Sequence, residues 1–190
     1  MSLFLTAQKP AAELTIILLT ITDSELKVTY EVRNRTEENL YIFNKLYEEI
    51  TPDLVLQTDK NLVNIIIRQE QVFVSKAIEP VPENLKVEYT MKPCVTKIGP
   101  LSIIDETFTV PLPLTPKTPY EQPEMSDEIA YKSLFFSVGY FVGHDLTESY
   151  EKTVKTPDGP AIRFDPFSYQ DQDVLTVGPL AQSVPVFEPK

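Results

Sequence analysis

Residues 26–33, LKVTYEVR, decide the fold class of this chain. Apolar and polar side chains alternate along the segment, with Leu26, Val28, Tyr30 and Val32 separated by Lys27, Thr29 and Glu31. Successive side chains of a strand point to opposite faces, so the pattern predicts one buried face and one solvated face. After a polar turn at residues 34–39, the extended pattern resumes in residues 40–44, LYIFN. The two segments predict a pair of antiparallel strands.

Further short β-rich runs, separated by turn signals, continue along the chain. They cover residues 13–22, 54–57, 62–68, 72–77, 85–91, 104–110 and 134–142. Residues 40–50 also fit a helical period, so a strand followed by a helical turn stays open there. Glu106 falls on the apolar face of its run, which predicts an edge strand or a local twist.

We therefore expect an all-β fold, specifically an immunoglobulin-like antiparallel β-sandwich over residues 10–142. Residues 111–123, PLPLTPKTPYEQP, predict an extended, proline-rich connection, because each proline lacks a backbone donor. Residues 143–190 have few apolar side chains, and we expect an irregular C-terminal extension packed on the sandwich.

Composition narrows the possible partners and the cellular location. The 17 basic and 28 acidic residues give a net charge of −11, and no basic patch is visible, which argues against nucleic-acid and membrane binding. The single cysteine, Cys94, allows no intrachain disulfide, and one Cys with one His cannot supply a structural zinc site. The N-terminal residues do not read as a signal peptide, so we expect a cytoplasmic protein. No glycine-rich nucleotide loop is present, and no cofactor is expected.

The single histidine, His144, is the candidate catalytic residue of an alternative hydrolase function. Asp145 follows it, and Ser137 and Ser149 are near in sequence. A Ser–His–Asp hydrolase also needs an oxyanion hole, and the G-x-S-x-G elbow is absent. A polar loop histidine is the favoured interpretation.

Two other groups of residues are candidates for binding. Asp165, Asp171 and Asp173 could hold calcium, although the EF-hand spacing is missing and a solvated acidic loop is favoured. Prolines 113, 116 and 119 satisfy the P-x-x-P spacing recognised by aromatic grooves, with Tyr120 beside them. A stiff inter-strand connection is the competing interpretation.

The strand–Asn-x-Thr–strand pattern of residues 28–43 resembles that of many immunoglobulin-like domains, including small intracellular proteinase inhibitors. The resemblance is one at the level of the fold. We predict a non-enzymatic protein-interaction module that binds a protein partner through a sheet edge or through Pro113, Pro116, Pro119 and Tyr120. A proteinase-inhibitor-like protein and a structural, homo-oligomeric domain paired through edge strands are the remaining alternatives.

Overall fold

The computed structural model describes residues 10–87, 90–144, 147–165 and 167–190. Strands account for most of these residues, and the two helical segments among them are short 3-10 turns, η1 (Thr147–Tyr150) and η2 (Tyr169–Asp171). The prediction of an all-β fold is thus confirmed. In the described ranges there is no helix that could cross a membrane.

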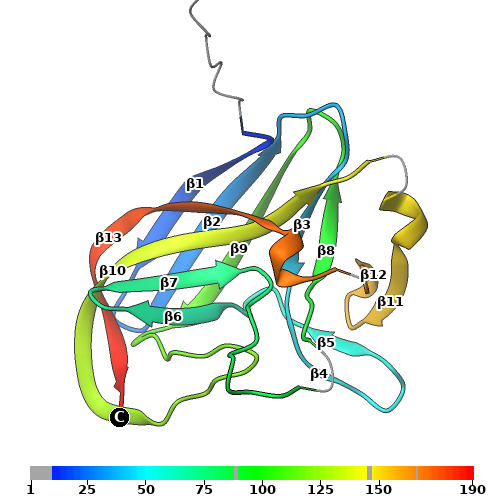
Figure 1. Ribbon diagram of the computed structural model, residues 1–190. Helices are drawn as coiled ribbons and strands as arrows, with labels where there is room; N and C mark the ends of the chain where they lie inside the picture. Colours follow the sequence, from blue (N-terminus) through cyan, green and yellow to red (C-terminus); the bar gives the residue numbers. More distant parts are fainter. Residues whose placement is uncertain (1–9, 88–89, 145–146, 166) are drawn as a thin grey trace, which may run out of the picture.

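The fold has two main layers, which Figure 1 shows crossing one another. The first is an antiparallel sheet in the order β1-β2-β9, made of β1 (Ala12–Ile21), β2 (Glu25–Asn34) and β9 (Ile103–Pro111). A small separate pair contains β4 (Tyr47–Ile50) and β5 (Leu56–Thr58). Residues 40–50 therefore hold two strands, β3 (Leu40–Lys45) and β4, on either side of Leu46, which excludes the helical alternative.

The second layer is an eight-stranded sheet built around β10 (Met125–Val142). One edge of β10 pairs with β13 (Asp173–Pro189), and the other pairs with β7 (Gln71–Lys76) and then with β3 (Leu40–Lys45). The remaining strands are β6 (Asn64–Arg68), β8 (Cys94–Ile98), β11 (Lys152–Thr156) and β12 (Gly159–Arg163). Because β10 and β7 run parallel, this sheet is mixed rather than purely antiparallel as expected.

The core lies between the two layers and confirms the alternation in β2. Leu26, Val28, Tyr30 and Val32 are all buried. The ring of Tyr30 lies 4.8 Å from that of Phe136 on β10 and 6.3 Å from that of Phe108 on β9, measured between centroids. The period of two thus places one face of the first layer against the central strand of the second.

Glu106 points from β9 toward this core, and its position has a local explanation. β9 is an edge strand, as expected. The carboxylate accepts hydrogen bonds from the Tyr30 hydroxyl and from Asn44 Nδ2. Lys76, itself buried, contributes a favourable charge from β7. The inward carboxylate is therefore hydrogen-bonded rather than isolated.

Residues 143–190 differ from the irregular extension predicted for them. They contribute three strands, and the 17-residue β13 buries Val184 and Val186 in the main core. β13 runs through Pro179 and Pro185, although each lacks a backbone donor. β10 is the one strand that pairs with it among the described residues, and on its other edge Leu114 bonds to the carbonyl of Pro185, so no donor is needed from that proline. Residues 85–87 and 90–91 form no strand, contrary to expectation, and residues 88–89 lie outside the described ranges.

Candidate functional site

A groove of about 630 Å³ opens where the proline-rich connection, residues 111–123, runs past the sheet ends. We call it the proline groove. On the sheet side its apolar lining includes Leu46, Leu62, Val63 and Met91. On the other side it is lined by Pro116, Pro119 and Pro123. Its volume lies within the range of roughly 300–1,000 Å³ that is usual for ligand sites.

The side of the groove formed by the proline-rich connection, residues 111–123, is called the proline wall. Backbone hydrogen bonds hold it in place at two points. Lys117 N donates to Ile65 O over 3.0 Å, and Ile65 N donates to Lys117 O over 2.8 Å, which attaches the wall to β6. Leu114 N donates to Pro185 O and Phe187 N donates to Leu114 O, both over 2.9 Å, which attaches it to β13. These four hydrogen bonds fix the proline-rich connection against the two strands, and an ordered surface of this kind loses little conformational entropy on binding.

The four residues predicted as a binding surface occupy different positions around this groove. Pro116 is buried and Pro119 is exposed, and both line it. The Tyr120 hydroxyl accepts a hydrogen bond from Met91 N over 2.9 Å and so connects the wall to the segment before β8. Pro113 is half-buried and is not part of the described lining.

Polar groups at the base of the groove are centred on Asn64. Its Nδ2 donates to Ala77 O over 3.3 Å and to Glu79 Oε1 over 3.1 Å. Ser75 Oγ donates to the same carboxylate oxygen over 3.2 Å. Burial raises the pKa of Glu79, and these two hydrogen bonds act against that rise. A half-buried carboxylate is thus held directly behind a residue that lines the groove.

Two charged side chains face each other across the lining. Lys117 Nζ lies 3.3 Å from Glu48 Oε1, and the side chains are 39 % and 66 % exposed. Lys117 belongs to the proline wall and Glu48 to β4, so the ion pair joins opposite sides of the groove. Because both partners are exposed, solvent screens the attraction and the pair contributes little to stability.

Sequence reasoning missed the sheet side of the groove. Leu46, Leu62 and Met91 belong to three segments that are far apart in the chain, and each reads as an ordinary apolar residue. Tyr47 is a further residue of the lining; its hydroxyl is buried without a hydrogen bond of normal geometry in the described structure. In the sequence, only prolines 116 and 119 pointed to this site. They indicated the proline side of the groove but not the apolar residues on the opposite side.

His144 lines a second cavity, of about 400 Å³, whose walls are largely aromatic. Phe141, Phe164 and Phe167 contribute to it, and the centroids of Phe141 and Phe167 lie 4.4 Å apart. Neither of the serines considered for hydrolysis is found in the described lining, and Ser137 Oγ lies 2.9 Å from Thr176 Oγ1 in the β10–β13 pair. Asp145 lies outside the described residues.

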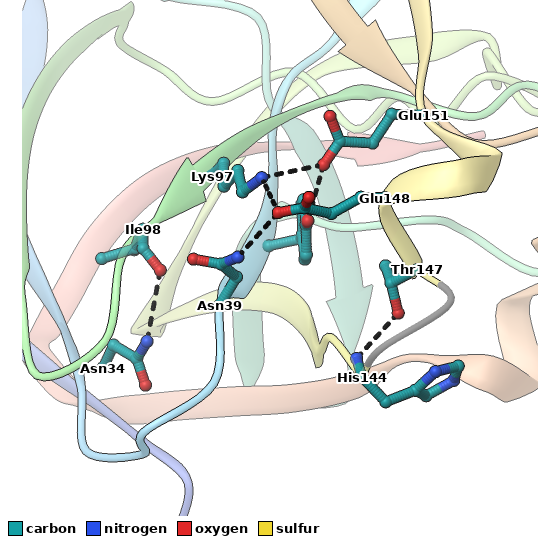
Figure 2. A network of polar contacts seen from close by, with 9 residues as sticks. Asn34, Asn39, Lys97, Ile98, His144, Thr147, Glu148 and Glu151 are labelled. Carbon is teal, nitrogen blue, oxygen red and sulfur yellow. Dashed lines mark hydrogen bonds and ion pairs between the residues drawn. The ribbon is translucent and has the colours of Figure 1, made fainter.

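Figure 2 shows how the segment after His144 is attached to the sandwich. His144 N donates to Thr147 Oγ1 over 2.8 Å at the start of η1. Lys97 Nζ lies 2.6 Å from Glu148 Oε1 and 3.1 Å from Glu151 Oε1. Burial, together with a hydrogen bond to Glu151, raises the pKa of Tyr41 in β3 to about 12. These contacts join η1 to β3 and β8.

The three candidate calcium ligands have separate partners. Asp165 Oδ2 lies 2.5 Å from Lys152 Nζ, and this hydrogen bond lowers the pKa of the carboxyl. Asp171 Oδ2 accepts hydrogen bonds from Ser168 N and Oγ over 2.8 and 2.7 Å. Asp173 begins β13. Within the described ranges, no three His, Cys, Asp or Glu side chains are grouped closely enough to hold a metal ion.

Comparison with protein-family models, with curated proteins and with solved structures found no match for this chain.

Proposed function

We propose that this protein is a non-enzymatic interaction module that takes an extended segment of a partner protein into the proline groove. The observation that carries the proposal is the wall itself, which four backbone hydrogen bonds to β6 and β13 hold open beside an apolar lining. Such a preformed surface suits a ligand that brings apolar side chains, because each large one buried contributes about 1.5–3 kcal/mol. The absence of nucleotide-type loops and the net charge of −11 favour protein over nucleic acid as the partner.

An extended segment fits the shape of the site better than a helix does. The connection passes along the groove as a chain of prolines with the bonded residues Leu114 and Lys117 between them. A second extended chain could lie beside it and place alternate side chains into the apolar lining, as in other modes of extended-peptide recognition. We also place the module in the cytoplasm, because Cys94 is buried and unpaired and the fold needs no oxidising compartment.

We further propose that the sandwich is an elaborated immunoglobulin-like domain. In such domains strands A, B and E pair in one sheet, and C, F and G pair in the other. The order β1-β2-β9 matches A-B-E, and the pairing of β10 with both β3 and β13 matches C-F-G. β8 takes the position of the additional strand C′ of variable-type domains. The β6–β7 and β11–β12 hairpins would then be additions to that plan.

The test is capture of partner proteins from a native lysate by matched variants. Leu62→Glu and Pro119→Glu each place a carboxylate in the groove, whereas Pro100→Glu places one on the exposed turn before β9. Proteins that bind in the groove should be retained by wild type and Pro100→Glu and lost from both groove variants. Losing one apolar contact of about 1.5–3 kcal/mol corresponds to a ten- to hundredfold weaker complex. Equal capture by all four proteins would refute the proposal, provided that their melting temperatures agree.

Self-association through β1 is a second candidate, and it is favoured because no strand among the described residues pairs with the outer edge of β1. Ile17, Leu18 and Ile21 are 57 %, 50 % and 40 % exposed, and residues 14–22 carry no charge. Antiparallel pairing of two copies about residues 15–20, TIILLT, would put threonine opposite threonine and isoleucine opposite leucine. The net charge of −11 opposes it. Light scattering decides the matter, because a monomer at every concentration, with Ile17→Lys unchanged from wild type, rules out this contact.

A further inference from the structure

The outer edge of β9 has no partner strand among the described residues. In Figure 1, β2 lies between β1 and β9, and it pairs with β9 without a shift of register. Ser102 O accepts a hydrogen bond from Asn34 N over 2.9 Å, so the even-numbered residues direct their backbone groups toward β2. Thr109 N donates to Asn61 Oδ1 over 2.9 Å, which shows that the odd-numbered residues direct theirs outward.

Three successive outward positions, Ile103, Asp105 and Thr107, therefore present backbone donors and acceptors at this edge. No hydrogen bond to their N–H and C=O groups is found among the residues that the structure describes. The three positions span about 14 Å, at roughly 3.4 Å per residue. A row of unpaired backbone groups of this length is a template for one more strand.

The immunoglobulin-like plan proposed above has a strand in this position. In that plan strand D pairs with strand E, and β9 takes the place of E. No described strand takes the place of D. Ile104 and Glu106 point inward from β9 and are both half-buried, so the core is incompletely covered here. An added strand would cover these side chains as well as pair with the backbone.

The charges beside the edge argue against a second copy of this chain as the occupant. Asp105 lies directly opposite Glu31 of β2, a pairing in which like charges repel. Arg33 lies 3.5 Å from Glu31, whereas Asp105 has no Lys or Arg within ion-pair distance in the described ranges. Symmetric antiparallel pairing of two β9 edges about Asp105 or Glu106 would place identical carboxylates opposite each other.

We propose that the outer edge of β9 accepts an extended segment of another protein as an additional antiparallel strand, with a lysine or arginine opposite Asp105. Residues opposite each other share a face of the sheet, so this cation lies on the outer face, beside a carboxylate that has no other partner. The neighbouring residue of the segment lies opposite Ile104 and is apolar, because it faces the core. The site is separate from the proline groove.

The probe is a fluorescein-labelled decapeptide of alternating valine and threonine, in which one central threonine is replaced by Lys, norleucine or Glu. Fluorescence anisotropy gives the affinity of each peptide. The Lys peptide should bind wild type up to about fivefold more tightly than the norleucine peptide does. Asp105→Asn should remove this preference. Glu37→Gln, on the exposed turn after β2, makes the same change of net charge and should preserve it.

Backbone substitutions test the addition of a strand directly. In the antiparallel pair, the residue opposite Asp105 directs its own N–H toward β9. N-methylation of the Lys and of every second residue from it should therefore abolish binding, whereas N-methylation of the other alternate residues should not. Thr107→Pro removes an outward donor that the β2 ladder does not use, and should weaken every peptide about tenfold. Thr107→Val keeps that donor and should bind as wild type does.

Each outcome either supports the proposal or overturns it. Equal affinity of the two N-methylated peptides would overturn strand addition, even if Thr107→Pro failed to fold. A Lys preference that survives in Asp105→Asn would overturn the position of the cation. Dimers that light scattering detects in wild type and not in Thr107→Pro would assign the edge to a second copy instead. Failure of every peptide to bind would refute the proposal, while Pro119→Glu should leave all affinities unchanged because the groove is not involved.

Discussion

Lys76 is enclosed by the sandwich, and its environment predicts a specific pH dependence of stability. The residue is 1 % exposed, and its Nζ donates to Asn44 O over 3.1 Å and to Lys60 O over 2.7 Å. The ammonium also lies 5.5 Å from the centroid of the Phe108 ring. Burial lowers the pKa of Lys76 from 10.5 to about 8, although the Glu106 and Asp59 carboxylates act in the opposite direction.

The sign and size of the effect follow from this difference in pKa. The folded protein releases the Lys76 proton near pH 8, whereas the unfolded chain keeps it until about pH 10.5. Between these values the unfolded state binds more protons, so the free energy of unfolding rises with pH. The full destabilisation, present below pH 8, is about 3 kcal/mol, and roughly 2 kcal/mol of it should disappear between pH 7 and 9.5.

The assay is urea unfolding followed by circular dichroism at half-unit steps from pH 7 to 9.5. Lys76→Met removes the titrating group, so wild type should gain about 2 kcal/mol relative to this variant across the range. Groups common to both proteins cancel in that difference. Lys27→Met, on the exposed face of β2, serves as the control and should run parallel to wild type. A constant difference between wild type and Lys76→Met would refute the reasoning.

Three further predictions concern packing and reactivity. Phe136→Ala removes a ring buried among other aromatic rings of the core and should lower the free energy of unfolding by about 3–5 kcal/mol in urea titrations. Gly139→Ala should cost about 1–3 kcal/mol in the same assay, because a Cβ there would lie 2.9 Å from that of Ala77 and would displace the Gln172 amide. Cys94 is fully buried, and burial raises the pKa of its thiol to about 11, so it should react with Ellman's reagent at pH 8 at the rate of unfolding. Immediate reaction in the native protein would contradict that placement.

The strand of residues 26–33 could be predicted because the environment of its two faces matches the alternation of apolar and polar side chains in the sequence. β2 has one face on the core and one in water, and this produces a period of two with no exceptions. β13 shows no such regular alternation. Its pairing with β10 shifts register at more than one point, and Pro179 and Pro185 interrupt its pattern. A strand whose alternation is broken by bulges and prolines has no periodic signal, so its existence depends on the partner strand.

One side of the proline groove, the side formed by the prolines, could be predicted from the sequence. The prolines identified a stiff connection, because the lack of a backbone donor is a property of the residue itself. The opposite side is assembled by long-range contacts, such as the hydrogen bond between Met91 and Tyr120 and the pairing of Lys117 with Ile65. Nothing local to Leu62 or Met91 distinguishes a groove residue from a core residue. The site therefore becomes visible when the topology is known.

The spacing of the prolines supports uptake of a ligand by the groove over capture of the connection by another protein. A chain with prolines at positions 113, 116 and 119 keeps donors at the residues between them. Two of these, Leu114 and Lys117, use their donors to reach β13 and β6, and each directly follows a proline. A P-x-x-P ligand must present its prolines to an external aromatic groove, but Pro116 is buried and the backbone beside it is already paired. Releasing it would break the contacts that hold the wall, whereas filling the groove would preserve them.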